Sequence, residues 1–144
     1  MKKTSFLIVI FTCSALGLLN SDDFGVKVRP LDEELVTVSA KEVVTTKISV
    51  RNHTSLKHEF ESEVTLPKKW KLISVDFPFE LSADQSKIKI ISFFVPDSTK
   101  SGKYEIKYKV SGRRFPSLSD EIKIRVVVRD SVEFKNKKLK IDKE

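Results

Sequence analysis

Apolar and polar residues alternate over long stretches of this sequence, which is the pattern of β-strands with one buried face. In residues 102–110, the alternation places four side chains on one face, opposite lysine and glutamate: Tyr104, Ile106, Tyr108 and Val110. Residues 43–52, 58–66 and 120–128 alternate in the same way. Residues 86–95 begin with alternation and then become apolar on both sides, which predicts a strand that is well covered.

Short stretches rich in Pro, Gly, Asn, Asp and Ser separate these segments, and such residues favour turns. After the first 20 residues, no segment has a convincing helical period. The pattern therefore predicts an all-β fold, an antiparallel β-sandwich of about seven to nine strands.

The first 21 residues have the layout of a secretory signal peptide, with two lysines, a mostly apolar run over residues 6–19 and then small residues. The apolar run is shorter than the ~20 residues that span a membrane, so we favour a cleaved leader over an N-terminal anchor. Cleavage after Gly17 or after Ser21 fits, and we prefer Ser21 because an acidic pair then starts the mature chain.

We therefore divide the chain into a signal peptide (residues 1–21), a β-sandwich domain (residues 22–131) and a lysine-rich C-terminal tail (residues 132–144). Cys13 is the only cysteine and lies in the predicted leader, so the mature chain would contain no disulfide. This favours an exported bacterial protein, either periplasmic or extracellular at the cell surface, over a small disulfide-stapled eukaryotic secreted domain. We expect no stable membrane span after cleavage of the leader.

Three motifs follow one another along the predicted domain: "ISVRN", which ends at Asn52, "LPKKW" (residues 66–70) and "FVPDSTKSGKYEI" (residues 94–106). Together they resemble bacterial immunoglobulin-like modules of exported proteins, of the NPCBM-associated or alpha-galactosidase-associated type. In that family the second motif reads L-P-x-G-W, and here Lys69 stands where glycine is usual. The resemblance covers roughly residues 43–110 and implies an immunoglobulin-like β-sandwich.

The third motif is interpreted as a corner between the two sheets. Pro96 ends one strand because it cannot donate to the ladder, and Gly102 tolerates backbone angles that other residues avoid. The resemblance implies that the Tyr104 hydroxyl bonds back to the crossing backbone. The other interpretation is a Tyr104 that simply faces solvent.

The sequence contains no arrangement typical of an enzyme, so we expect no catalytic residues, no metal and no cofactor. His53 and His58 are the only histidines, and no third ligand accompanies them at a suitable spacing. The acids of "EFESE", Glu59, Glu61 and Glu63, project from one strand face and are interpreted as a solvated surface.

The formal net charge is +7, yet the predicted leader sends the chain out of the cytoplasm, and the lysines alternate with glutamates. We therefore expect no nucleic-acid partner. Arg113 and Arg114, in the turn "SGRRF", are candidates for binding an anionic or acidic partner.

Three aromatic residues complete the binding candidates. Trp70 could be an exposed platform for sugar, but we favour a place in or at the rim of the core. Phe77 and Phe79 lie in "VDFPFELS", which is either a loop that plugs the open end of the sandwich or an exposed lip for a partner. We favour the plug.

These observations predict a non-catalytic, exported interaction or structural module. It would serve as an accessory of a bacterial envelope, secretion or pilus-assembly complex, with an envelope or surface protein as its partner. The alternative is a carbohydrate-binding or adhesin module of the cell surface, with polysaccharide as its ligand.

Overall fold

The computed structural model of the protein describes residues 24–32 and 35–129. Within these ranges the chain forms nine strands and no helix: β1 (Val26–Pro30), β2 (Leu35–Ser39), β3 (Val43–Asn52), β4 (His58–Thr65), β5 (Lys71–Leu72), β6 (Phe79–Leu81), β7 (Ser86–Phe94), β8 (Gly102–Gly112) and β9 (Ser119–Arg129). The all-β prediction is confirmed. The predicted signal peptide and the lysine-rich tail lie outside the described residues.

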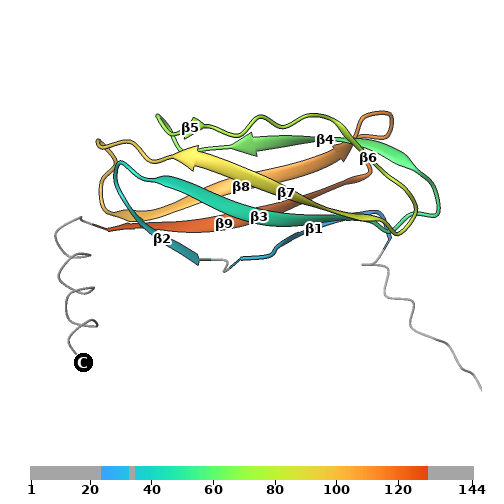
Figure 1. The fold of residues 1–144 in the computed structure, drawn as a ribbon, viewed down its shortest axis with the longest axis horizontal. Coiled ribbons are helices and arrows are strands. Elements are labelled where there is room, and N and C mark those ends of the chain that lie inside the picture. The colour runs from blue at the N-terminus through green and yellow to red at the C-terminus, as the bar shows by residue number, and fades with distance from the viewer. Residues whose placement is uncertain (1–23, 33–34, 130–144) are drawn as a thin grey trace, which may run out of the picture.

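The strands form two sheets that pack face to face (Figure 1). One sheet has the order β1-β3-β7-β5, and the other has the order β2-β9-β8-β4-β6. Neighbouring strands are antiparallel except for β2 and β9, which are parallel. The chain thus passes from one sheet to the other between β1 and β2.

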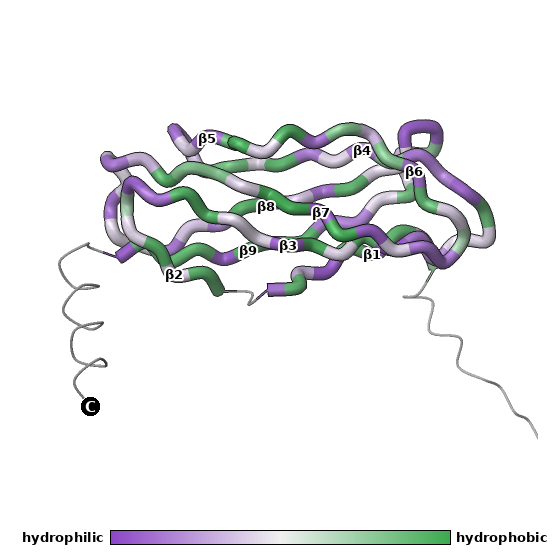
Figure 2. Tube along the Cα trace, viewed as in Figure 1, coloured by the Kyte–Doolittle hydropathy of each residue, from purple (hydrophilic) through white to green (hydrophobic). Residues whose placement is uncertain are grey.

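The core lies between the sheets and is built by the predicted alternation, which Figure 2 shows as apolar and polar residues following one another along the long strands. On β8, Ile106, Tyr108 and Val110 are fully buried, whereas the lysines between them are exposed. On β3 the predicted inward face is buried as well: Val44, Thr46, Ile48 and Val50. Burial of these apolar side chains is the main force that holds the sandwich together.

Strand β7 differs from the prediction of a strand with two covered faces. Its second half is covered, since Ile91 and Phe93 are buried, but Ile88 and Ile90 are 60% and 58% exposed. The inward position between these two isoleucines belongs to Lys89, whose side chain is largely buried. The sequence pattern did not reveal that a lysine, and not the isoleucines, faces inward here. Lys89 is buried only because it forms an ion pair with Asp76, which lies outside the strand.

The stretch "VDFPFELS" does more than plug the sandwich. Its second half forms strand β6, which pairs with β4 and places Phe79 opposite Phe60. Phe79 and Leu81 are buried. The preceding residues, 73–78, connect β5 in one sheet to β6 in the other and are called the crossing segment below.

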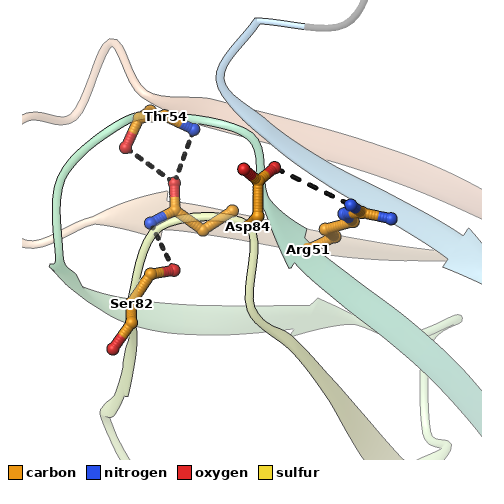
Figure 3. Close-up of polar contacts among 5 residues, drawn as sticks. Arg51, Thr54, Ser82 and Asp84 are labelled. Atoms are coloured by element: carbon orange, nitrogen blue, oxygen red, sulfur yellow. Dashed lines mark hydrogen bonds and ion pairs between the residues drawn. The ribbon is translucent and has the colours of Figure 1, made fainter.

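Asn52, which ends the first sequence motif, is fully buried and holds two turns together. Figure 3 labels one of its partners in each turn, Thr54 and Ser82. Its Nδ2 atom donates to the carbonyl oxygens of Leu56, Leu81 and Ser82 at 2.8, 3.1 and 3.1 Å. Its Oδ1 atom accepts hydrogen bonds from the backbone N–H and the hydroxyl of Thr54, at 3.0 and 2.8 Å. The amide therefore fixes the loop after β3 against the turn after β6.

Lys69 adopts the backbone conformation that glycine would favour at its place in the second motif. Its φ angle is +73°, in the left-handed region, and the Trp70 N–H donates to the Pro67 carbonyl at 3.1 Å to close the turn. The lysine in place of glycine therefore leaves the turn intact. Its Cβ atom makes the left-handed backbone conformation sterically less favourable than it would be for glycine.

Candidate interaction surface

Trp70 lies in the core and offers no exposed platform, since only 7% of its surface is accessible. Its ring stacks on Phe93 with centroids 5.6 Å apart and packs against Tyr104 at 5.2 Å. A buried indole with two aromatic neighbours stabilises one end of the sandwich and cannot stack on a sugar.

The predicted corner joins β7 to β8 beside Trp70. The Tyr104 hydroxyl donates to the carbonyl oxygen of Lys100 at 2.7 Å, so it bonds back to the backbone a few residues upstream. The Thr99 N–H donates to the Pro96 carbonyl at 3.0 Å, and Gly102 starts β8. These residues therefore form a structural turn.

Of the two phenylalanines of the proposed lip, one lies in the core and the other lies on the surface. Phe79 is buried, with its ring centroid 5.9 Å from that of Phe60, whereas Phe77 is 71% exposed. The lip therefore retains one of the two predicted side chains.

The two arginines lie in the turn between β8 and β9. The guanidinium of Arg113 donates to the Glu59 carboxylate at 2.9 Å, and this hydrogen bond raises the pKa of Arg113 above its ordinary value. Arg114 and Phe115 help to line a hollow of about 350 Å³, together with His58. The Phe115 ring packs edge-on against the His58 ring, with centroids 5.7 Å apart.

The five predicted binding residues do not form one site. Tyr104, which contacts Trp70, lies near the start of β8, and Arg113 follows its end, so the strand separates them by about 30 Å. Phe77 lies on the crossing segment, and Phe79 belongs to the core.

A polar cluster holds the crossing segment in place. The Asp76 carboxylate forms an ion pair with Lys89 of β7, accepts a hydrogen bond from Ser62 of β4, and lies 3.4 Å from the Tyr108 hydroxyl of β8. Burial raises the pKa of Tyr108 above its ordinary value, and the neighbouring carboxylate acts in the same direction. The ammonium of Lys89 also lies 4.2 Å from the centre of the Phe79 ring, a cation–π contact. One carboxylate thus connects strands of both sheets.

Because Asp76 points inward, its neighbours point outward and expose apolar surface. Val75 and Phe77 are 76% and 71% exposed, and Ile73 is half exposed. The segment starts beside β7, where the N–H groups of Ile73 and Ser74 donate to the Ser92 carbonyl at 2.8 and 3.1 Å. We call the exposed apolar residues of the crossing segment and β7 the apolar strip: Ile73, Val75, Phe77, Ile88 and Ile90.

The backbone of β7 is paired on only one side over much of its length. Ser92 uses both its N–H and its C=O on the side away from β3. Because backbone groups alternate between the two sides of a strand, those of Ile88 and Ile90 point the same way as those of Ser92. Strand β5 covers only Phe93 and Phe94, and no other described residue pairs with Ile88 or Ile90 from this side. The edge of β7 therefore presents unpaired hydrogen-bonding groups.

Sequence reasoning found Phe77 but missed Ile88, Ile90 and Asp76. The signal for the isoleucines was present in "SKIKI", where lysine and isoleucine alternate. Alternation alone does not say which set faces the core, and hydrophobicity favours the wrong choice here. The deciding contact is the ion pair between Lys89 and Asp76, which are distant in sequence.

Among residues 24–32 and 35–129, no group of three or more His, Cys, Asp or Glu side chains is placed to hold a metal ion. The same residues include no helix that is long and apolar enough to cross a membrane.

No family model matches the sequence, and no curated protein matches it. The fold is nevertheless similar to solved structures. The chain has an immunoglobulin-like fold. In native alpha-2-macroglobulin from Escherichia coli, spanning domain MG7 to the C-terminus, the match has a TM-score of 0.60 and 15% identity and covers 76% of this chain and 17% of that one.

Two shorter chains match this immunoglobulin-like domain over almost their whole length. The FixG-related protein from Vibrio parahaemolyticus has a TM-score of 0.55 and 15% identity, over 75% of this chain and 98% of that one. A chain of the complex between Zinc 2-glycoprotein and Prolactin inducible protein from human seminal plasma has a TM-score of 0.59 and 12% identity, over 76% and 98%. At these identities the likeness concerns the fold alone.

Proposed function

We propose that this protein is an exported, non-catalytic interaction module that binds a protein partner at the edge of β7. In this role it serves as an accessory of a bacterial envelope, secretion or pilus-assembly complex and acts in the periplasm or at the cell surface. The observation that carries the proposal is the unpaired edge at Ile88 and Ile90, both of which are more than half exposed.

An edge of this kind can accept an extended segment as an additional strand. The partner's backbone would form hydrogen bonds with the N–H and C=O groups of Ile88 and Ile90, and its side chains would cover the apolar strip. Exposed edges with apolar, β-branched residues invite such pairing, and proteins usually protect them. Here Lys87 provides partial protection, because an exposed cation at the edge disfavours indiscriminate stacking.

The comparisons support a protein partner in general terms, since one similar fold was solved as part of a complex of two proteins. Export and an envelope partner rest on the sequence pattern of the leader. A polysaccharide ligand has less support, because Trp70 lies in the core.

The test is capture of envelope proteins from the cells that make this protein, with the full chain as bait. We expect a defined envelope protein to be retained by the unmodified chain and lost when Ile88→Lys and Ile90→Lys are combined. The control is Leu35→Lys on β2, which replaces an apolar side chain that is 50% exposed in the other sheet and should preserve capture.

Circular dichroism of each variant is the check that the fold is retained. Capture that is equally strong with the edge variant, or capture of polysaccharide alone, would contradict the proposal.

A further inference from the structure

The two sheets carry very different charge. The strands of the four-stranded sheet contain no acidic residue, and all their charged residues are cations: Lys27, Arg29, Lys47, Arg51, Lys71, Lys87 and Lys89. In the five-stranded sheet, strands β4, β6, β8 and β9 together mix Asp and Glu with Lys and Arg. The excess positive charge of the strands is therefore concentrated on one side of the sandwich.

The outer face of the four-stranded sheet contains a hollow of about 190 Å³. It is lined by cationic and hydroxyl side chains and one histidine: Lys27, Arg29, Ser49, Arg51, His53 and Ser86. The strand register explains this lining, since Lys27 lies directly opposite Arg51 and Arg29 lies opposite Ser49. On the other side of β3, Ser86 of β7 lies opposite Arg51.

This arrangement is electrostatically unfavourable without a bound anion. Like charges directly opposite each other on neighbouring strands destabilise a sheet, and Lys27 and Arg51 are such a pair. Asp84 offsets part of this repulsion, with its Oδ1 atom 3.7 Å from Arg51 (Figure 3). No ion pair among the described residues includes Lys27 or Arg29.

The side chains of the hollow have the chemistry that recognises a tetrahedral oxyanion. The guanidinium groups of Arg29 and Arg51 present planar sets of N–H donors that match two oxygens at a time. Lys27 adds a compact positive charge, and the hydroxyls of Ser49 and Ser86 can donate to remaining oxygens. A carboxylate has only two oxygens to share among these donors, whereas a phosphate has more.

We propose that this hollow binds a phosphate group. The group is either a free phosphate ion or the headgroup of an anionic phospholipid, and Ile88, opposite Ser49 on β7, adds an exposed apolar side chain on the same face. The site lies on the outer face of the sheet and does not depend on strand addition at the edge of β7. Its test is therefore separate from the test of the proposed function.

The test follows the amide NMR signals of Lys27, Ser49 and Arg51 in the full chain during titration with sodium phosphate, against sodium chloride of equal ionic strength. The binding variant combines Lys27→Gln and Arg29→Gln. The control combines Lys107→Gln and Lys109→Gln, which remove the same charge from exposed positions on β8. A second titration compares vesicles of phosphatidylglycerol with vesicles of phosphatidylcholine.

We expect saturable signal changes when the unmodified chain is titrated with phosphate. The affinity for phosphate should fall about tenfold or more in the binding variant, because charge-assisted hydrogen bonds are lost. The affinity of the control variant should change little. Binding to phosphatidylglycerol vesicles that weakens in the same variant would identify the headgroup as the source. Phosphate binding without vesicle binding would identify the free ion. The proposal is overturned if neither probe gives saturable changes, or if both pairs of substitutions weaken binding equally.

Discussion

Lys69 shows how one residue can adopt a strained backbone conformation without altering the fold. Its φ angle of +73° is easy for glycine but crowds the Cβ atom of every other L-amino acid against the backbone. The turn survives because the burial of Trp70 immediately after it fixes the chain direction.

Lys69→Gly should therefore stabilise the protein, by about 0.5–1 kcal/mol, because relief of steric strain exceeds the added flexibility of the unfolded chain. Equilibrium unfolding in urea measures the change. The control is Lys68→Gly at the neighbouring exposed position, which has no positive φ and should be neutral or slightly destabilising. Equal effects at both positions would argue against strain at Lys69.

Other single residues differ in how far their roles could be predicted. The Tyr104 hydrogen bond follows from a local motif, since its acceptor is Lys100, four residues upstream. Asn52 is also visible at the end of a strand, but two of its carbonyl acceptors, Leu81 and Ser82, lie about thirty residues away. A single sequence does not reveal such a distant contact.

At the scale of elements, the crossing segment and β7 depend on each other. The crossing segment leaves β7 after Ser74, so the edge of β7 at Ile88 and Ile90 stays uncovered. Asp76 of the same segment allows Lys89 to occupy an inward position. The alternation of β7 was predictable, but its orientation was not, because that orientation depends on a tertiary ion pair.

Amide hydrogen exchange should show this edge directly. The N–H groups of Ile88 and Ile90 should exchange quickly with deuterated water, whereas those of Lys87, Lys89 and Ile91 should be protected by their hydrogen bonds to β3. NMR spectra recorded after transfer to deuterated water resolve the five amides, and the protected ones serve as internal controls. Uniform protection from residue 87 to residue 91 would mean that the edge is covered.

The ion pair between Asp76 and Lys89 should matter far more than a surface pair. Asp76→Asn leaves the largely buried Lys89 without its counter-charge, so we expect a loss of about 2–3 kcal/mol in unfolding free energy. Asp97→Asn is the matched control, because its ion pair with Lys41 is exposed on both sides and should contribute less than about 1 kcal/mol.

Thermal and urea unfolding of both variants provide the comparison, and a double variant with Lys89→Met should recover part of the loss. Similar losses in the two single variants would contradict the role assigned to Asp76.

For the whole molecule, the two-sheet architecture was predictable because apolar and polar residues alternate along the long strands with a period of two. In β3, β8 and β9 the inward faces agree with the alternation, and the strand count falls within the predicted range. The candidate surfaces were less predictable. The edge of β7 depends on how short β5 is, and the cationic hollow depends on the register that brings Lys27 opposite Arg51.

The parallel pairing of β2 with β9 has a mechanical consequence. The described chain begins and ends at opposite ends of the sandwich (Figure 1). Tension along the chain would pull β2 and β9 in opposite directions along their common axis. The slanted hydrogen bonds of this parallel ladder, whose register runs from Leu35↔Arg125 to Ser39↔Arg129, would then bear the load together in shear, rather than opening one at a time. The domain is thus arranged to withstand stretching along the axis of these two strands.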